Sequence, residues 1–585
     1  MGHWITFGVV TAKENKDTCP SHVHQSYNNS TPFTAILNSS FTTKSFYQDD
    51  MKMVNKVPDV KVAVIGAGWS GIYALKYLIE EELDVICFEK RENIGGVWRL
   101  AEEKETTASS SKTYLHPSDF PFDENTYDFP SARQINDHIE KYAEKFNLLD
   151  RIQFGTEVLS LRYINSKWEI LLRKEQRIFE IRAENIVIAV GTANKPYIPD
   201  DLARKFSGIP VTHNQDITMK QLSTLSDDEC VLVVGGGESA TDMAAKICEK
   251  SRVKVVLSLR TGRWFLFKKK PPENNFPADV VSRKTLFLFS LSWFVKWFDW
   301  YVISEMGVGS HGVPAWAPNK ETSSWGCFIN KRGEEAISGV RRGRILPAGK
   351  ITKISTDNIV TFENVEHPLR ISRVIFATGY RFDTTLLSPV NIQPPSSAYQ
   401  YTFPTTDGYG SIAFVGAARP NMGSVPSLAE ITAIWISRVF SGRTTLPSVD
   451  TAVQKCADQT AKRLKNFGSD GEKLTTLVYE VDYVDSIMKE LGMIYLVRLL
   501  PPINVIWMYG LRGVWVWWTL FLSGWSPLEY RVLLNKDGKG LEALEEIRKM
   551  NRVRKIRSPG SLLSHMIRFT VRRIREFVFS CFTIT

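Results

Sequence analysis

A short glycine-rich turn between an apolar run and a helical segment constrains the fold of this chain more than any other feature. Residues 61–65 (KVAVI) are apolar and β-branched, and residues 66–71 (GAGWSG) follow them directly. Residues 72–82 have the composition of a helix, and a second apolar run, residues 83–89, ends in an acid. This order is typical of the β-α-β unit that binds a dinucleotide, so it predicts a Rossmann-like α/β domain.

Each glycine of this first motif has a steric role in such a unit. Gly66 permits the tight turn, Gly68 lets the backbone approach a pyrophosphate, and Gly71 lets the helix pack on the strand. The helix N-terminus that follows offers N–H donors and positive potential to phosphate. An acid about 20 residues further on can bind ribose hydroxyls. The residues that we expect to contact the cofactor are Gly66, Gly68, Trp69, Ser70, Gly71 and Glu89.

Residues 95–98 (GGVW) add a second glycine pair after this unit. The first motif by itself does not distinguish NAD from FAD, and a glycine turn in an ordinary α/β domain is the alternative interpretation. A further glycine pair is unusual for a simple dehydrogenase, however. We therefore add Gly96, Val97 and Trp98 to the predicted cofactor contacts.

The same pattern recurs at residues 230–264, with a strand-like run, a glycine turn, a helical segment and another apolar run. The last of these runs ends in Arg260 rather than in an acid. A guanidinium can bind a 2′-phosphate that a carboxylate would repel, so this motif predicts NADPH and leaves FAD for the first. The alternative is a solvated arginine at a strand end. The predicted contacts of the second motif are Gly235, Gly237, Glu238, Ser239, Ala240 and Arg260.

A chain of 585 residues is too long for a single core. An FAD domain with an inserted NADPH domain explains the two motifs better than a duplicated fold. Residues 185–199 and 373–383 each read as a strand that ends in glycine, where the chain would leave and re-enter the FAD domain. The predicted parts are a flexible extension (1–58), the first part of the FAD domain (59–195), the NADPH domain with an apolar insertion (196–372), the second part of the FAD domain (373–490) and a C-terminal membrane-associating helical region (491–585).

Cysteine usage and charge disfavour several other classes of protein. The seven cysteines are scattered without a C-x-x-C, which argues against a disulfide scaffold, a zinc site or a disulfide reductase. The net charge is +10, and residues 548–575 hold ten Lys and Arg and no acid. A basic segment beside apolar ones favours an anionic membrane surface over nucleic acid as a partner.

The chain resembles the flavin-containing monooxygenases, class B flavoproteins that also include Baeyer–Villiger enzymes. The resemblance covers about residues 60–550 and implies two Rossmann-like domains, with Thr378 and Gly379 among the cofactor contacts. The motifs that carry it, in the order of the family, are residues 66–71, 95–98, SDFPF at 118–122, 235–240, FATGY at 376–380, ARPNMGSVPSLAE at 418–430 and SPLEYRV at 526–532.

The resemblance also implies the reaction, that of an N-oxide-forming, dimethylaniline-type monooxygenase. In that family NADPH reduces FAD, O₂ adds to give a C4a-hydroperoxide, and bound NADP⁺ shields this intermediate from water. A soft nucleophile, such as a tertiary amine or a thioether, then takes the distal oxygen. Because the cofactor supplies the difficult chemistry, no catalytic triad or carboxylate pair is required.

Two further site residues follow from the resemblance, and each has an alternative interpretation. The family has an asparagine near the flavin where this chain has Ser109. The alternatives are Ser110 or Ser111 in that role, or a flexible serine loop without one. Arg419 lies in a segment that resembles the flavin-contacting C-terminal part of the family, unless it is a surface arginine. We name Ser109 and Arg419 as the candidate catalytic residues.

The family fingerprint F-x-G-x-x-x-H-x-x-x-(Y/F/W) is only partly present. Phe206, Gly208 and His213 match it with one extra residue, but Ile217 replaces the aromatic residue, and His213 could simply have a structural role in a linker. Oxygenation of nitrogen or sulfur is therefore favoured over ketone insertion. An NADPH oxidase that releases H₂O₂, a Baeyer–Villiger enzyme and a flavoprotein that senses NADPH without turnover are the competing functions, and the oligomeric state, a homo-oligomer included, is open.

Membrane attachment is expected at the C-terminal region. The apolar zones at residues 285–303, 499–511 and 514–528 are rich in aromatic residues, but none supplies cleanly the roughly 20 apolar residues of a spanning helix. Residues 561–585 have helical periodicity with arginines on a separate face, which suits a helix lying in the membrane interface. Packing on the protein surface and a spanning helix are the alternatives. Similar enzymes are often bound to the endoplasmic reticulum, so we expect peripheral or monotopic attachment there or at another intracellular membrane.

Overall fold

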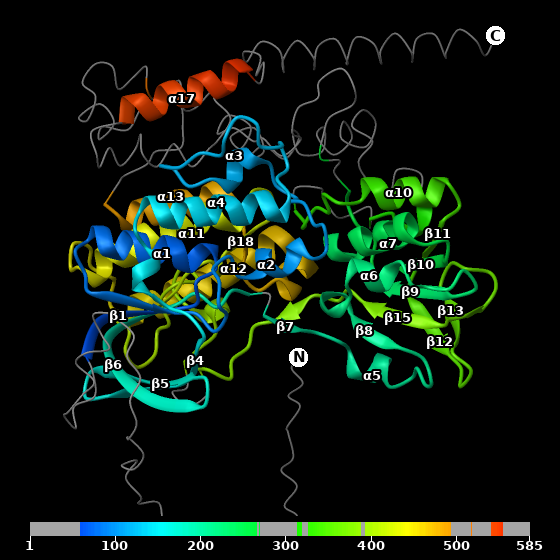
Figure 1. The fold of residues 1–585 in the computed structure, drawn as a ribbon, viewed down its shortest axis with the longest axis horizontal. Coiled ribbons are helices and arrows are strands. Elements are labelled where there is room, and N and C mark those ends of the chain that lie inside the picture. The colour runs from blue at the N-terminus through cyan, green and yellow to red at the C-terminus, as the bar shows by residue number, and fades with distance from the viewer. Residues whose placement is uncertain are drawn as a thin grey trace, which may run out of the picture. The chain divides into compact units, whose positions relative to one another are not determined.

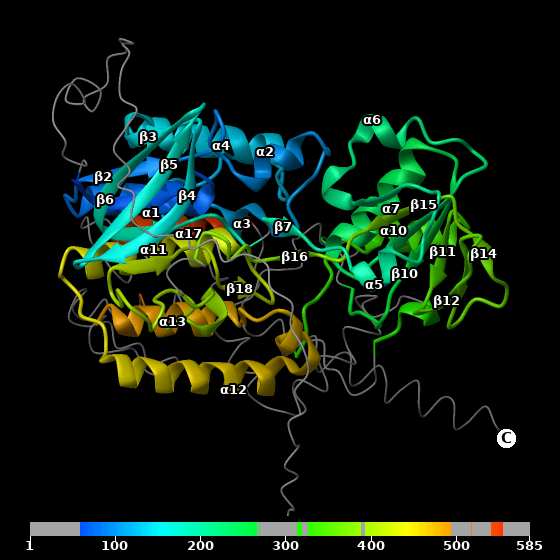
Figure 2. The same cartoon turned by 90° about the horizontal axis from the view of Figure 1, so that it is seen from below.

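The described residues build two separate β-sheets, each covered by its own helices (Figures 1 and 2). The structure is a computed structural model, and it describes residues 59–192, 194–265, 268, 313–318, 326–387, 392–492, 516 and 540–553. The predicted extension at residues 1–58 lies outside these ranges. Both sheets are built around parallel strands, as the two glycine motifs predict.

The first sheet has the strand order β3-β2-β1-β6-β5-β4, and β17 also pairs with β6. The strands β1, β2, β3 and β17 run parallel to their neighbours and to β6, whereas β4, β5 and β6 form an antiparallel meander. The strands are β1 (Asp59–Ile65), β2 (Val85–Phe88), β3 (Ile152–Gln153), β4 (Thr156–Ile164), β5 (Lys167–Lys174), β6 (Arg177–Ile188) and β17 (Ile412–Phe414).

Side chains alternate across β1 and so divide the core of this half into two layers. Val62 and Val64 face the helices, whereas Ala63 and Ile65 pack with the β4–β5 hairpin. The helices above the sheet in Figure 1 include α1, α4, α11 and α13. The helices of this half are α1 (Trp69–Glu80), α2 (Val97–Glu102), α3 (Lys112–Leu115), α4 (Ala132–Lys145), α11 (Val425–Phe440), α12 (Val449–Lys473), α13 (Glu480–Glu490) and α17 (Gly540–Val553), with 3-10 turns η1 (Leu149–Arg151) and η6 (Pro395–Ser397) and the strand pair β18 (Arg419–Pro420) and β19 (Leu477–Val478).

The second sheet is parallel throughout, in the order β11-β10-β9-β15-β8. Its face with Val231 and Val233 packs on α7 and α10, and its face with Leu232 packs on a three-stranded antiparallel sheet, β12-β13-β14. The elements are β8 (Val211–His213), β9 (Cys230–Val234), β10 (Lys254–Ser258), β11 (Ile345–Ala348), β12 (Ile351–Ile354), β13 (Ile359–Phe362), β14 (Leu369–Arg370), β15 (Arg373–Phe376), α5 (Asp200–Ala203), α6 (Met219–Leu222), α7 (Glu238–Lys250), α10 (Glu334–Arg341), η2 (Asn214–Asp216) and η4 (Pro314–Trp316).

The two connections between the sheets run side by side. The strand β7 (Lys195–Pro196) pairs antiparallel with β16 (Tyr380–Arg381), in the two segments that the sequence marks as crossovers. The predicted return to the FAD domain at residue 373 is too early, because β15 (Arg373–Phe376) pairs with β9 and β8 in the second sheet. The chain crosses back only after this strand.

The C-terminal region differs in part from the prediction. Ala543, Leu544 and Ile547 of α17 are buried in the same apolar core as α1 and α11, so residues 540–553 belong to the globular body. The segments at 285–303, 499–511 and 561–585, and all of 514–528 except Val516, lie outside the described residues. Among the described residues, no helix is both long and apolar enough to cross a bilayer.

A buried carboxyl group fixes the SDFPF segment to two helices of the first half. Glu430 on α11 is fully buried and accepts the Tyr77 hydroxyl at 2.7 Å and the Ser118 hydroxyl at 2.6 Å. Its two oxygens also accept the Ser118 N–H, at 2.9 and 3.0 Å. Burial, and then the negative charge of Asp119, raise the pKa of Glu430 to about 7. Lys76 in turn binds the Asp119 carboxylate at 2.7 Å.

We predict that Glu430→Gln changes how stability depends on pH. The raised folded-state pKa means that protonated Glu430 favours folding, and that this contribution, roughly 3 kcal/mol, disappears as pH rises from 4.5 through 7. The glutamine has no such loss, so the melting temperature of the variant should improve relative to the parent between pH 5 and pH 8. Thermal unfolding with Glu366→Gln, an exposed control, measures this. A difference that does not vary with pH would contradict the prediction.

Candidate functional site

The first glycine turn is held against a backbone carbonyl of the neighbouring strand. Gly66 has φ +101°, and a Cβ placed there would lie 2.8 Å from the Ala189 carbonyl oxygen, just beyond β6. A Cβ on Gly71 would lie 1.9 Å from the Gly66 carbonyl oxygen. Only glycine fits at these two positions, as the predicted turn and close helix–strand packing require.

Two glycines from different segments face each other where this turn leads into α1. A Cβ on Gly96, which has φ +59°, would lie 3.0 Å from the Cα of Gly68. Trp98 meets Trp69 edge to face, with ring centroids 6.4 Å apart, while Val97 is exposed. The two predicted glycine segments therefore form one backbone cradle at the N-terminus of α1. Its shape fits the pyrophosphate of a dinucleotide.

The two remaining residues of the first motif also have structural contacts. Glu89 at the end of β2 is buried and accepts the Ala67 N–H at 2.7 Å and the Arg91 N–H at 3.0 Å. Each oxygen has a further lone pair, so ribose binding remains compatible with this arrangement. Ser70 packs against Gly416, where an added Cβ would lie 2.1 Å from the serine hydroxyl.

The second glycine turn repeats the construction of the first. Gly235 has φ +146°, and a Cβ there would lie 2.3 Å from the carbonyl oxygen of Ala377, just beyond β15. Ala240 is fully buried against this turn, and Ser239 is exposed. A Cβ on Gly237 would meet no atom within 4 Å, so the backbone is open at the N-terminus of α7. This open side fits a second dinucleotide.

Three other predicted contacts lie around the second turn. Arg260 is exposed just beyond the end of β10. Thr378 donates to the Tyr197 carbonyl oxygen, and the Gly379 carbonyl oxygen accepts the Tyr197 N–H at 3.0 Å. Thr378 and Gly379 therefore hold the two crossovers together, directly after Ala377, whose carbonyl oxygen lies against Gly235.

His213 has the structural role that the sequence left as an alternative. Its ring is buried, with Nε2 3.1 Å from the Gly379 carbonyl oxygen and Nδ1 accepting the Gln215 N–H at 3.2 Å. Burial lowers the pKa of this imidazole. Both ring nitrogens are therefore engaged, Nε2 with the crossover at Gly379 and Nδ1 with the local turn at Gln215.

The three serines predicted near the flavin differ in their surroundings. Ser110 and Ser111 are buried, whereas Ser109 is partly exposed and its hydroxyl has no hydrogen-bond partner among the described residues. The Ser110 hydroxyl donates to the Gly423 carbonyl oxygen and accepts from the ammonium of Lys331 at 3.0 Å. Of the three, Ser109 is the one whose hydroxyl is available to a ligand.

Lys331 was not identified from the sequence. It is buried, and its N–H donates to the carboxylate of Glu238, the first residue of α7, at 3.2 Å. It therefore connects the second glycine turn with Ser110 through one backbone and one side-chain contact. Only the sequence separation of more than 200 residues between Lys331 and Ser110 hid this pair.

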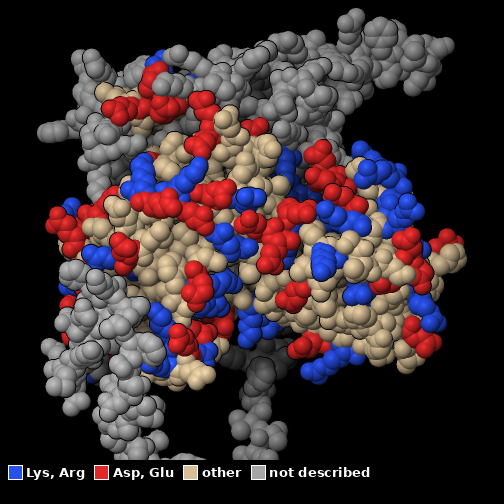
Figure 3. Space-filling view, in the orientation of Figure 1, with Lys and Arg blue, Asp and Glu red and all other residues tan. Residues whose placement is uncertain are grey.

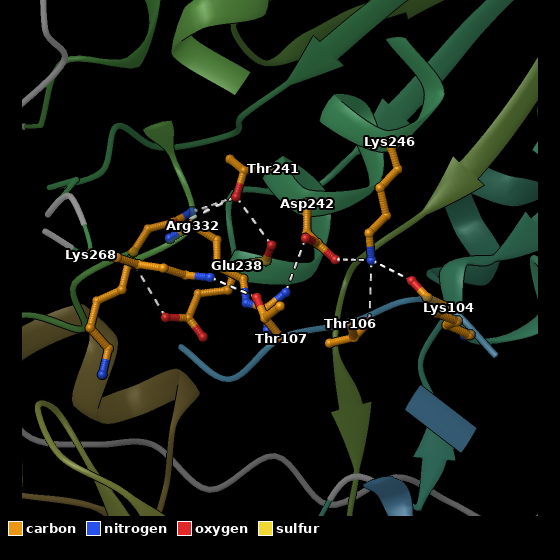
Figure 4. Close-up of polar contacts among 11 residues, drawn as sticks. Lys104, Thr106, Thr107, Glu238, Thr241, Asp242, Lys246, Lys268 and Arg332 are labelled. Carbon is orange, nitrogen blue, oxygen red and sulfur yellow. Dashed lines mark hydrogen bonds and ion pairs between the residues drawn. The ribbon is translucent and has the colours of Figure 1, made fainter. Parts of the chain in front are cut away.

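We call residues 104–111 the serine loop, and several cations of the NADPH half bind it (Figure 4). The Lys246 ammonium donates to the Lys104 carbonyl oxygen at 2.6 Å and to the Thr106 hydroxyl at 3.2 Å. Lys268 donates to the Thr107 hydroxyl at 2.8 Å. The serine loop, which belongs to the predicted FAD domain, is therefore fixed by α7 and by the segment after β10.

Two ionisable groups beside this loop have shifted pKa values. Burial, followed by the charge of Arg332, lowers the pKa of Lys268 to about 8. Burial tends to raise the pKa of Asp242, but Arg332 at 3.0 Å and Lys246 at 2.9 Å lower it overall. Asp242 thus stays ionised between two cations, and Figure 4 shows it between Lys246 and Arg332.

Arg419 packs beside residues of the NADPH half. Its guanidinium is largely buried over the ring of Phe328, 4.5 Å from the centroid, and burial lowers its pKa while the charge of Glu238 opposes the shift. Its N–H donates to the Thr476 carbonyl oxygen at 2.9 Å. It is therefore not a surface arginine, and its guanidinium packs on Phe328 of the NADPH half. Its role at the flavin stays a prediction.

The surface drawn in Figure 3 carries mixed charge. On this face, Lys and Arg of the described residues alternate with Asp and Glu, without an extended basic surface of the kind that follows a phosphate backbone. That nucleic acid is no partner stays a prediction.

The fold and the two glycine turns define an α/β protein with two dinucleotide sites, and comparisons identify its family. Residues 59–571 match the model of the family described as "Flavin-binding monooxygenase-like", so the chain belongs to this family and is a flavin-dependent monooxygenase. Membership bears out the predicted cofactors, FAD and NADPH.

Named relatives agree with this placement. Dimethylaniline monooxygenase [N-oxide-forming] 2 of Macaca mulatta is 29% identical over 464 residues, which cover 74% of this chain and 82% of the relative. Among solved structures, S-allyl-L-cysteine S-oxygenase from Allium sativum is similar with a TM-score of 0.53 at 17% identity, over 74% of this chain and 89% of that one. The OTEMO complex with FAD and NADP has a TM-score of 0.57 at 14% identity, over 75% and 98%. The structural likeness shows the fold.

We predict that Gly237→Ala weakens nucleotide binding without disturbing the fold. The added methyl group meets no neighbour within 4 Å and φ is −84°, so FAD content and melting temperature should match the parent. Because the methyl group occupies the approach of the pyrophosphate, the Kd for NADP⁺ should rise by roughly tenfold or more, about 1.4 kcal/mol. Titration calorimetry measures this.

Gly71→Ala is the contrasting variant. Its methyl group would overlap the Gly66 carbonyl oxygen, so this variant should lose FAD. Unchanged NADP⁺ affinity in Gly237→Ala would show that the second turn is not the nucleotide site.

Proposed function

We propose that this protein uses NADPH and O₂ to oxygenate soft nucleophilic nitrogen or sulfur centres of small molecules. FAD is assigned to the cradle of Gly68 and Gly96, and NADPH to the open turn at Gly237. The observation that carries the proposal is the serine loop, which belongs to the FAD half and is held by the residues that surround the NADPH turn. Reduced flavin, when bound, supplies the electrons and carries the activated oxygen.

The residues of the chain then bind the cofactors, orient the reacting groups and exclude water from the site. The glycine turns and the N-termini of α1 and α7 bind phosphates. The Lys331 ammonium donates to the Ser110 hydroxyl, which is therefore engaged within the protein. The Ser109 hydroxyl remains as a donor where the family has an asparagine amide. Burial of Arg419 and Lys331 between the two halves supports a site from which water is largely excluded.

The preference for nitrogen or sulfur rests on sequence and on similarity. The similar proteins include an N-oxide-forming dimethylaniline monooxygenase and an S-oxygenase. Ile217, which is buried, stands where the fingerprint has an aromatic residue, and the tryptophan of the Baeyer–Villiger version is absent. Ketone insertion is therefore the second candidate.

The test is product formation by the purified, FAD-loaded full-length chain. NADPH and oxygen consumption would be recorded with N,N-dimethylaniline, a methyl aryl sulfide and cyclohexanone, together with the H₂O₂ released. N-oxide or sulfoxide in proportion to NADPH supports the proposal. A lactone would favour the ketone reaction, and H₂O₂ equal to NADPH with every substrate would identify an oxidase. Bound FAD without NADPH oxidation would favour a sensor.

We predict that Ser109 controls how much oxygen is lost as H₂O₂. Ser109→Asn introduces a longer donor of the family type and should lower the H₂O₂ released per NADPH, whereas Ser109→Ala removes the donor and should raise it. Changes of roughly tenfold are expected for one hydrogen-bond donor at a reacting oxygen, at unchanged FAD content. Equal H₂O₂ yields in all three proteins would exclude a catalytic role for Ser109.

Attachment to a membrane is a separate proposal that concerns the C-terminal region. The basic, helical pattern of residues 561–585 supports a helix in the interface of an intracellular membrane, peripheral or monotopic. The full chain should float with anionic vesicles. A variant in which Arg568, Arg572 and Arg575 are replaced by Gln should not. Equal flotation of the variant and the full chain would contradict attachment through this helix.

A further inference from the structure

The C-terminal end of α12 is joined to the turn that follows β10. Arg263, three residues after Arg260, donates from Nη1 to both carboxylate oxygens of Asp470, at 2.8 and 2.6 Å. The same carboxylate accepts the Phe328 N–H at 3.0 Å. The Asp470 side chain is almost fully buried, so it is engaged with Arg263 and Phe328. A helix of the FAD half thereby reaches the strand end where the sequence places the 2′-phosphate.

Lys473 is the last residue of α12, one turn after Asp470. Partial burial, and then the positive charge of Arg263, lower its pKa, and Arg260 adds to this effect. The nearby acids Asp470 and Glu472 oppose the shift without cancelling it. Arg260 lies three residues before Arg263 and Lys473 three residues after Asp470, so the Arg263–Asp470 ion pair brings the segments of these two cations together, although they come from different halves of the protein.

In the part of the chain that the structure describes, neither Arg260 nor Lys473 forms an ion pair, and both are exposed. The Asp470 carboxylate already binds the Arg263 guanidinium. An anion that binds between two neighbouring cations removes their mutual repulsion.

We propose that Lys473 completes the 2′-phosphate subsite and is a determinant of the preference for NADPH over NADH. Arg260 supplies a planar fork and Lys473 a compact ammonium, which is the donor set that suits a phosphate. The inference rests on the assignment of the second glycine turn to NADPH. It adds that the dinucleotide contacts both halves of the protein, because Lys473 belongs to α12.

The experiment compares two fragments of the nucleotide on the FAD-loaded full-length protein. The Kd values for 2′,5′-ADP and for 5′-AMP are measured by calorimetry, together with KM for NADPH and NADH. Lys473→Ala should weaken 2′,5′-ADP by roughly tenfold, the scale of one charge-assisted hydrogen bond, and leave 5′-AMP unchanged. KM should rise for NADPH and not for NADH. Lys473→Gln, which keeps the length of the side chain, should behave like the alanine variant, and Lys473→Arg should recover most of the affinity.

Two further variants separate the possible causes. Lys465→Ala, which removes an exposed lysine from the same helix, should leave every value unchanged. If Arg260→Ala weakens 2′,5′-ADP while Lys473→Ala and Lys473→Gln do not, Lys473 is not part of the subsite, although the assigned NADPH site stands. If neither Arg260→Ala nor the Lys473 variants change the ratio of the two affinities, the 2′-phosphate binds elsewhere and the assignment itself is wrong. An equal loss of 5′-AMP affinity would show a general disturbance and would also overturn the proposal.

Discussion

A contact between two backbones organises both halves of this protein. In each half, the first glycine of a strand–helix turn approaches the carbonyl oxygen of an alanine that follows a neighbouring parallel strand. The pairs are Gly66 with Ala189 and Gly235 with Ala377. A side chain at either glycine would overlap that oxygen, so the turn and the start of the helix both depend on the absence of a Cβ.

These two contacts also determine where the chain crosses between the halves. The alanines lie at the starts of the two crossover segments, and those segments pair with each other through β7 and β16. Thr378, Gly379 and His213 then fasten the crossovers by hydrogen bonds to backbone groups. The strand ends that support the nucleotide turns are thus continuous with the connection between the two sheets.

The serine loop shows how one half contributes to the site of the other. Lys246, Lys268 and Lys331 lie in the NADPH half and donate to the backbone or hydroxyls of residues 104, 106, 107 and 110. Asp242 balances part of this charge between Lys246 and Arg332. The position of Ser109 therefore depends on residues that surround the second glycine turn.

The sequence by itself determined the local units of this protein. Both glycine motifs, the strands beside them and the family could be predicted, because strand, glycine turn, helix and second strand follow one another in consecutive residues and so can be recognised in the sequence. Boundaries were less accurate. The helix α1 begins at Trp69, inside the motif and before the expected residue 72, and β15 belongs to the second sheet rather than to the returning FAD domain.

Only the tertiary structure decided which distant residues meet. The direction of Arg419, the burial of α17 in the core, and the pairs Lys331 with Ser110 and Arg263 with Asp470 join residues that are far apart along the chain. No periodicity or spacing in the sequence encodes such contacts. They arise from the packing of whole helices and sheets, whereas the order of strand, glycine turn and helix is written in a few consecutive residues.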